Sequence, residues 1–362
     1  MMKGRWWKTG MAFAGLLCRM AFGQTNGDSS DRDVRVGVAG FPVVFYTPET
    51  SAGIGGGLTL TFRPADAPDT GHPDHVSMFL LYTLNQQVMG SVFPQCYLGE
   101  NWKIGAALAY RDFPDEYYGL GNDTREGDAE DFTTRDVVIN PYLLRRVVSR
   151  AWAGVAYDWK NTDVLEIEAD GLLAGGGLAG TDGSRLSGLG PMLEWDSRDQ
   201  AFAPRSGALY RLIALFYRDG MGSENAYDAV MADGRHYWST GNDRVVAVQW
   251  RISTVSGGIP FNEYARLDDV RGVLESRYRA RKAAMVQAEY RFPVKGRFSG
   301  VTFVSAGEVM DRWGDASWSG LHAAGGVGLR FALNREERIN LRLDLGFGED
   351  GLYPYIRMME AF

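Results

Sequence analysis

Residues 256–281 read SGGIPFNEYARLDDVRGVLESRYRAR and separate two segments that alternate apolar and polar residues. The segments at 244–254 and 282–292 each place apolar side chains on one face and polar side chains on the other, which predicts two β-strands. Loops of this length between strands are uncommon and are usually either functional or disordered. Because this one places Arg271 next to a glycine, we predict that Arg271 turns back into the lumen of a membrane barrel.

The composition favours an all-β chain over a helical membrane protein. After the first 25 positions the sequence holds no apolar run of about 18 residues, which a membrane-spanning helix needs. Alternating barrel strands cancel in mean hydropathy, and the value of -0.22 fits them. The 46 glycines and 12% aromatic residues also suit strands and turns, and the net charge of -7 gives no reason to expect nucleic acid.

The N-terminus has the features of a secretory signal: basic residues, a short apolar core and a small-x-small cleavage site. We therefore expect a signal peptide at 1–23, a polar lead-in at 24–34 and an outer-membrane β-barrel over 35–362. Cys96 would then be the only cysteine left after cleavage. It is interpreted as a small buried apolar group, with a reactive thiol as the alternative.

Alternation and turn signals predict about sixteen strands, an even number as bacterial barrels require. They are placed at 35–47, 51–63, 74–86, 87–98, 102–112, 131–145, 149–162, 184–196, 205–219, 225–239, 242–254, 282–293, 299–309, 320–332, 336–348 and 352–362.

The predicted connections differ in length between the two ends of the strands. Most connections after even-numbered strands are short, and 64–73 is the exception. The long ones follow odd-numbered strands, at 113–130, 163–183, 255–281 and 310–319. Long loops on one rim and short turns on the other are typical of outer-membrane barrels, whereas a soluble sandwich has no reason to keep this pattern. Aromatic residues near predicted strand ends suit interfacial girdles, among them Tyr117, Tyr118, Tyr237, Trp238, Trp313, Trp318, Tyr353 and Tyr355.

Four groups of residues resemble motifs of the BamA/TamA-like family of outer-membrane assembly and translocation barrels, also called the bacterial surface antigen family. They are the loop motif Val270-Arg271-Gly272-Val273 with Tyr278; the turn motif Asp196-Ser197-Arg198-Asp199 with Pro204 and Gly207; residues 288–293 with Phe303-x-Ser305-x-Gly307; and the chain end, where Tyr355, Met358 and Phe362 resemble the family's folding signal. The predicted strand count places the loop between strands 11 and 12, where the family has its sixth extracellular loop.

The resemblance implies a sixteen-stranded antiparallel transmembrane β-barrel with an inward-folded sixth extracellular loop, located in the bacterial outer membrane. It implies a role in outer-membrane biogenesis, through protein insertion, protein translocation or lipid homeostasis. The alternative is a passive pore or structural barrel that retains the family fold. The implied partners are outer-membrane lipid and lipopolysaccharide, with unfolded outer-membrane proteins or assembly machinery as clients. We expect a monomer with no cofactor, no metal and no nucleic acid.

Three positions depart from the family pattern. Val273 replaces an aromatic residue, Ser305 stands where an aspartate is often found near the loop arginine, and Met359 stands where the last strand often has glycine. The family's periplasmic POTRA modules do not fit before the first predicted strand, so the resemblance is to a barrel-only member.

The alternation around 282–292 places Gln287, Glu289 and Arg291 on the lumen face. A buried guanidinium needs carboxylate or carbonyl partners. We therefore predict that Arg271 pairs with Glu289 and forms a lumen clamp with Gly272 and Ser305. With Ser305 in place of a carboxylate, the clamp is expected to have one charged partner fewer. Alternatively, Arg271 only stabilises or plugs the barrel.

The family's insertases are thought to use a weakly closed seam between the first and last strands. Here that seam would join 35–47 to 352–362. Pro42 and Pro354 both lie in it, and each removes a donor from the hydrogen-bond ladder. The prolines therefore either weaken the seam or sit harmlessly at strand ends and bulges.

Enzyme motifs are weak. The sequence Gly53-x-Gly55-Gly56-Gly57 resembles a dinucleotide loop but runs into a strand rather than a helix. No GxSxG motif is present, and His72 and His75 lack a third metal ligand in the sequence around them. We therefore expect no catalytic residues.

Overall fold

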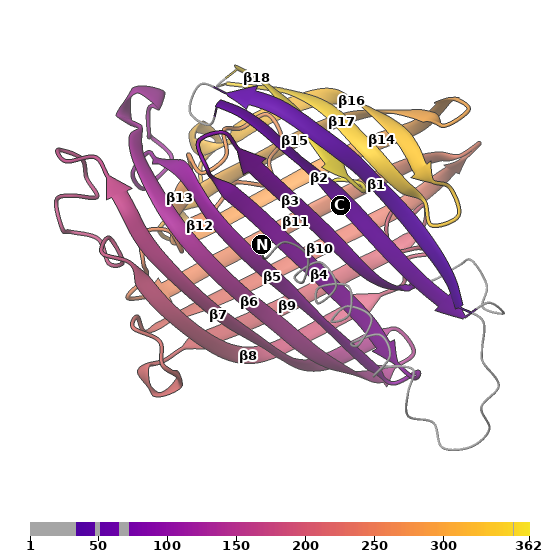
Figure 1. Cartoon of the computed structure of the whole chain (residues 1–362), viewed down its shortest axis with the longest axis horizontal. Helices are drawn as coiled ribbons and strands as arrows, with labels where there is room; N and C mark the ends of the chain where they lie inside the picture. Colours follow the sequence, from indigo (N-terminus) through magenta and orange to yellow (C-terminus); the bar gives the residue numbers. More distant parts are fainter. Residues whose placement is uncertain (1–33, 48–50, 65–71, 350) are drawn as a thin grey trace, which may run out of the picture.

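The computed structural model describes residues 34–47, 51–64, 72–349 and 351–362. The expected signal peptide and nearly all of the polar lead-in lie outside these residues. Sixteen strands form one antiparallel sheet in which every strand pairs with its neighbours in sequence (Figure 1). The sheet confirms the predicted fold class and strand number.

The strands follow the alternating segments of the sequence closely. Their bounds are β1 Val34–Thr47, β2 Ser51–Pro64, β3 Asp74–Thr83, β4 Val88–Leu98, β5 Trp102–Tyr117, β6 Glu130–Val148, β7 Ala151–Ile167, β8 Ser184–Asp196, β9 Gly207–Tyr217, β10 Tyr227–Gly241, β11 Arg244–Gly257, β14 Lys282–Lys295, β15 Phe298–Met310, β16 His322–Asn334, β17 Ile339–Gly348 and β18 Gly351–Met358. The largest differences from prediction are that β5 and β7 run further into the long loops and that β18 ends before the last four residues.

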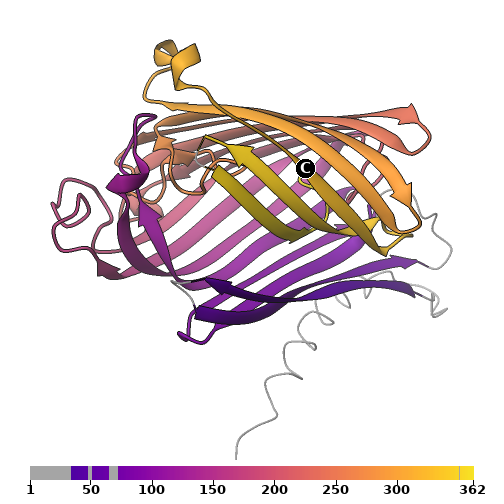
Figure 2. The same cartoon turned by 90° about the horizontal axis from the view of Figure 1, so that it is seen from above.

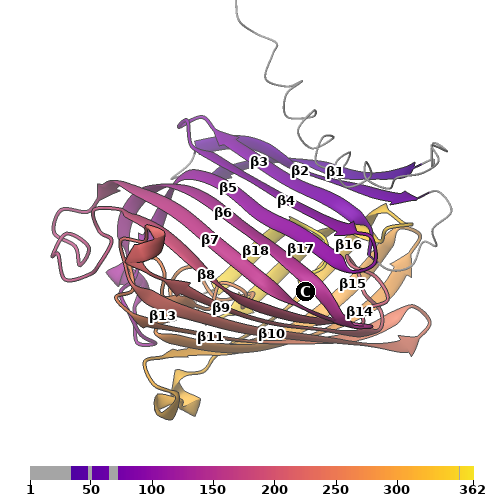
Figure 3. The ribbon, with the colours of Figure 1, turned by 90° about the horizontal axis from the view of Figure 1, so that it is seen from below.

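The sheet curls into a cylinder, seen from two opposite sides in Figures 2 and 3. Its two faces have opposite chemistry, as β14 shows. Gln287, Glu289 and Arg291 are buried inside, whereas Val286 and Tyr290 are 48% and 39% exposed on the outside. A wall that is polar inside and apolar outside is the arrangement of a transmembrane β-barrel. Among the described residues, no helix has the length and apolarity that a membrane-crossing helix needs.

The connection between β11 and β14 folds into the lumen and carries its own small sheet. Its two short strands are β12 (Ala265–Arg266) and β13 (Arg279–Ala280). Isolated bridges join Arg279 to Gly121 and Pro260 to Ala179, so the inward loop is tied to two of the long loops. Phe261 is fully buried in a cluster with Tyr117, Phe132 and Leu173. The long-loop end of the lumen is therefore filled by packed side chains.

The predicted aromatic girdle is only partly correct. Tyr117, Tyr118 and Tyr237 are almost fully buried. Tyr117 packs against Phe261 of the inward loop, and Tyr237 packs against Phe362 at the chain end. Trp238 and Trp318 are exposed, as a girdle requires. Other exposed aromatic side chains on the wall include Trp102, Tyr110, Trp195, Tyr210, Trp250 and Phe298.

The first and last strands are the two edges of the sheet, and within the described part of the chain no ladder joins β1 to β18. The predicted backbone seam is therefore not formed. Pro42 and Pro354 both lie inside paired stretches, opposite Gly56 and Leu345, so neither sits at a strand end. β18 is also short, because the chain turns at Met359, whose φ is 70°.

Side chains, rather than backbone hydrogen bonds, connect the two edges at the short-turn end. Arg63 at the end of β2 makes a two-pronged contact with Glu337, at 2.7 and 2.8 Å. Ala39 of β1 packs in a cluster with Phe202 and Ile339. Phe202 belongs to the turn 197–206, which enters this end of the lumen and donates from Gln200 to the carbonyl of Glu336. Each end of the lumen thus contains an inward segment.

Candidate functional site

The inward loop 258–281 is anchored by apolar residues on both sides of its arginine. Val270, Val273 and Tyr278 are buried in a cluster that includes Met285 of β14 and Val309 of β15. The ring of Tyr278 also stacks on His322, with centroids 3.6 Å apart. The loop-motif residues thus hold the loop against the wall, and Val273 fills its place without an aromatic ring.

Gly272 lies where the loop backbone presses against β17. Its φ of 98° favours glycine, and its N–H donates to the Tyr355 hydroxyl at 3.0 Å. The residues of β17 that face Gly272 are also glycines, Gly346 and Gly348. A Cβ added to Gly348 would lie 1.9 Å from the Gly272 carbonyl oxygen, and one added to Gly346 would lie 2.8 Å from the Gly272 nitrogen. Glycine on both sides therefore permits an approach that larger residues would block.

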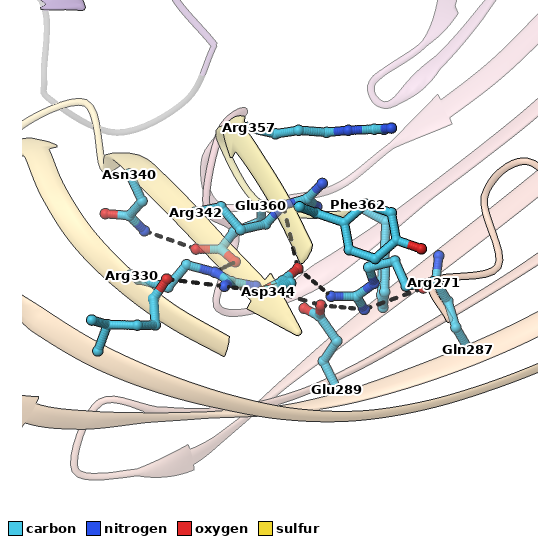
Figure 4. Close-up of polar contacts among 12 residues, drawn as sticks. Arg271, Gln287, Glu289, Arg330, Asn340, Arg342, Asp344, Arg357, Glu360 and Phe362 are labelled. Atoms are coloured by element: carbon cyan, nitrogen blue, oxygen red, sulfur yellow. Dashed lines mark hydrogen bonds and ion pairs between the residues drawn. The ribbon is translucent and has the colours of Figure 1, made fainter. Parts of the chain in front are cut away.

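This approach delivers the Arg271 side chain into a pocket of carboxylates, where it is 5% exposed (Figure 4). Nη2 lies 2.6 Å from Glu289 Oε1, and Nη1 lies 2.8 Å from Asp344 Oδ2. Nη2 also donates to Gln287 Oε1 at 3.2 Å. The guanidinium carbon lies 3.8 Å from the centre of the Phe303 ring, a cation–π contact. The structure thus brings Arg271 and Glu289 together and adds Asp344 and Phe303.

Ser305 has a different contact from the one that its place in the motif suggested. Its hydroxyl donates to the backbone carbonyl of Arg271 at 3.2 Å and makes no contact with the guanidinium. The prediction that the clamp has one charged partner fewer is wrong, because Asp344 of β17 supplies a second carboxylate to Arg271. Ser305 therefore binds the backbone of Arg271, and Asp344 binds its side chain.

Further arginines extend the clamp into a buried ion-pair network. Arg291 contacts the second oxygen of Glu289 at 2.8 Å, and Arg330 contacts Asp344 at 2.5 Å. Arg330 also binds Glu360 at 2.8 Å, and Asn340 donates to the same carboxylate. Removing one partner of a buried pair leaves an uncompensated charge and typically costs about 3–5 kcal/mol. The network therefore favours one arrangement of loop, wall and C-terminus.

The C-terminal tail 359–362 is part of this interior rather than of the last strand. Phe362 is 4% exposed and packs with Tyr237, Val245 and Ala247. Arg291 donates to its main-chain oxygen at 3.0 Å. Of the other two residues named as a folding signal, Met358 packs beside the Ala39 cluster and Tyr355 binds Gly272. The prediction that Phe362 ends the last strand is wrong because Met359 turns the chain inward.

The turn motif builds the segment 197–206 at the opposite end of the lumen. Asp196 holds Arg198 at 2.8 Å, and Asp199 accepts hydrogen bonds from the Arg205 backbone and the Arg338 side chain. Pro204 is buried. Gly207 has a φ of 94°, and a Cβ there would lie 2.1 Å from the Ser197 carbonyl. These residues therefore shape a turn and do not touch Arg271.

Two neighbours complete that end of the lumen. Glu194 binds Lys103 and Arg211 at 2.7 Å each, in a network apart from the clamp. His72 lies 3.6 Å from Asp196. Burial lowers the pKa of His72, although the Asp196 carboxylate opposes the shift. His72 therefore favours its neutral form when the turn is in place.

Sequence reasoning missed Asp344, Arg330, Phe303 and Glu360 as members of the site. Asp344 and Arg342 alternate with the leucines of β17, so parity alone places both in the lumen. Phe303 shares its face with Ser305 by the same rule. Glu360 carried no such signal, because the alternation of β18 gives no warning that the chain turns inward at Met359.

Comparison with known proteins agrees with this architecture. The chain is similar in fold to BamA from Haemophilus ducreyi lacking POTRA domains 1–3, at 10% identity and a TM-score of 0.55, over 90% of this chain and 68% of that one. It is similar in fold to CdiB from Acinetobacter baumannii, at 13% identity and a TM-score of 0.55, over 90% of this chain and 59% of that one. No curated protein matches the sequence. Residues 71–348 match the Omp85 superfamily domain, and the chain belongs to that superfamily.

Proposed function

We propose that this protein is a bacterial outer-membrane barrel that takes part in outer-membrane biogenesis, inserting or translocating polypeptide, with loop 258–281 as an internal clamp. The observation that carries the proposal is the buried Arg271, held between Glu289 and Asp344 at 2.6 and 2.8 Å. Membership of the Omp85 superfamily and the polar-inside, apolar-outside wall support the location. We assign the protein no catalytic chemistry.

The contacts of the clamp favour a closed resting state. Withdrawing Arg271 would leave Glu289 and Asp344 short of a partner, at a cost on the order of 3–5 kcal/mol. A ligand or client shifts such an equilibrium only by as much as it prefers the open form. We therefore infer that the loop leaves the lumen when a client polypeptide supplies that preference.

The two edges of the sheet offer a place where such a client could bind. β1 and β18 each present one side without a strand partner among the described residues. An unpaired edge is a template for adding an extended segment through main-chain hydrogen bonds. Since Tyr355 of β18 binds Gly272, the loop and the edge strand are mechanically linked. Loop release and strand addition are therefore expected to be coupled.

Single-channel conductance in planar bilayers tests the clamp. The wild-type barrel should be mostly closed, and Arg271→Ala should open it or make it flicker. The matched control is Arg185→Ala, which removes an exposed arginine paired with Glu224. A steady large pore in all three proteins would support a passive channel instead. Depleting the protein in cells and following outer-membrane protein and lipid levels tests the role in biogenesis directly.

A further inference from the structure

A cavity of about 320 Å³ lies at the short-turn end of the barrel, apart from the clamp loop. It is bounded by the turns between β8 and β9, β10 and β11, β14 and β15, and β16 and β17, together with the C-terminal tail. Two carboxylates line it, Asp243 and Glu360, against six arginines: Arg205, Arg291, Arg297, Arg330, Arg335 and Arg338. Four of these arginines are paired with carboxylates: Arg205 with Asp243, Arg291 with Glu289, Arg330 with Asp344 and Glu360, and Arg338 with Asp199. The positive charge that remains in the lining is that of Arg297 and Arg335.

The two carboxylates are already engaged by other residues. Asp243 pairs with Arg205, and Glu360 accepts from Arg330 and Asn340. Two exposed arginines at the mouth, Arg297 and Arg335, are not neutralised in this way. Arg297 donates to the Ala332 carbonyl, and Arg335 has no ion pair with any residue that the structure places. Positive charge at the mouth thus remains available.

The base of the cavity contains guanidinium groups with unused donors. The side chains of Arg291 and Arg330 are 9% and 1% exposed. Yet Arg291 Nη1 and Arg330 Nη2 have no hydrogen-bond acceptor within the described part of the chain. A buried donor without an acceptor costs about 1–3 kcal/mol. Both nitrogens are closed to solvent, so they add to the positive potential at the base of the cavity rather than contact an anion directly.

Apolar residues beside the cavity indicate what kind of molecule carries the anion. Phe292, Pro293 and Phe298 also line it, and Phe298 is 45% exposed. Val294, near the end of β14, is 58% exposed. A free inorganic anion would make no favourable contact with these apolar residues, whereas the acyl chains of a lipid would pack on them.

We propose that this cavity binds the phosphate group of an anionic lipid from the leaflet at the short-turn rim. Guanidinium groups match phosphate oxygens through paired N–H donors, and basic residues at a membrane surface attract anionic headgroups. Arg297 and Arg335 attract the phosphate and donate to its oxygens at the mouth of the cavity. The inference rests on the proposed membrane location but not on the clamp at Arg271.

Lipid retention tests the site. The full chain is reconstituted in nanodiscs containing phosphatidylcholine and phosphatidylglycerol, transferred to neutral detergent, and examined by native mass spectrometry for bound lipid. The wild type should retain phosphatidylglycerol in preference to phosphatidylcholine. Removing both mouth charges in Arg297→Gln/Arg335→Gln should reduce that retention by about 30-fold, since each basic residue contributes to headgroup attraction.

The matched control is Arg185→Gln/Arg218→Gln, which removes two exposed arginines near the opposite rim. It should retain phosphatidylglycerol like the wild type, and heat-modifiable migration in detergent should show that all three proteins fold. Equal retention by the wild type and the mouth variant would overturn the proposal.

Calorimetry with inorganic phosphate distinguishes a lipid headgroup from free phosphate as the ligand. Binding of free phosphate without selective lipid retention would also overturn the assignment to lipid. Conductance distinguishes this failure from a failure of the clamp, because the mouth variant leaves Arg271 unchanged.

Discussion

Arg271 and Asp344 meet at 2.8 Å, and this contact ties the inward loop to β17, the strand next to the edge. Glu289 on β14 holds the other side of the same guanidinium. The loop thus bridges two strands that are not adjacent in the sheet, with β15 and β16 between them. A change at the edge of the sheet that moves β17 would therefore reach the loop directly.

Replacing Asp344 with Asn should destabilise the barrel although the side chain keeps its size. The change leaves Arg271 and Arg330 each with one carboxylate fewer inside a buried network. We expect a loss of about 3–5 kcal/mol, measured as the shift in the midpoint of urea unfolding. Asp182→Asn, at an exposed loop position, is the control and should change stability by less than about 0.5 kcal/mol. Equal stability of the two variants would show that the contacts of Asp344 with Arg271 and Arg330 do not stabilise the barrel.

Gly348→Ala should push the loop away from the wall without touching any charged group. The added methyl would lie 1.9 Å from the Gly272 carbonyl oxygen, which is backbone and cannot move alone. We expect faster proteolysis within loop 258–281 in the folded protein. Gly314→Ala, where a Cβ meets nothing within 4 Å, is the matched control. Unchanged cleavage of the Gly348 variant would contradict the close packing of loop and β17.

Glu360→Gln should loosen the C-terminal tail. Arg330 loses a carboxylate at 2.8 Å, and Arg291 loses one at 3.7 Å. We expect the variant to lose about 3–5 kcal/mol and to expose Phe362 to carboxypeptidase. Glu349→Gln, whose side chain is 62% exposed, should stay within about 1 kcal/mol of the wild type. Equal resistance of the tail to carboxypeptidase in both variants would show that Glu360 does not hold the tail in place.

Acid should loosen the turn 197–206 through His72. Burial lowers the pKa of His72 from its usual 6.5, against the opposing effect of Asp196. Because the folded protein binds this proton more weakly than the unfolded chain does, the stability of the turn is unaffected well above pH 6.5 and decreases as the pH falls from 6.5 to the folded-state pKa. Hydrogen exchange in 197–206 should therefore be faster at about pH 5.5 than at about pH 7.5, after correction for intrinsic rates. His72→Gln should reduce the difference, and an undiminished difference in this variant would assign it to another group.

Sequence reasoning accounted for most of the wall. A period of two is set by strand geometry itself, so β14 and β17 could be placed, and Glu289 assigned to the lumen, from alternation alone. Contacts made across the lumen could not be predicted from alternation. The pairing of Arg271 with Asp344 depends on how the sheet curls, and the inward turn at Met359 depends on interior partners for Glu360 and Phe362.

A double-mutant cycle on single-channel open probability tests most directly whether Arg271 and Asp344 form one clamp. Arg271→Gln and Asp344→Asn should each raise the open probability at least tenfold, consistent with loss of more than about 1.4 kcal/mol from the closed state. The double variant should open little more than either single variant, because both remove the same contact. Single variants that stay closed, or effects that simply add, would contradict the account.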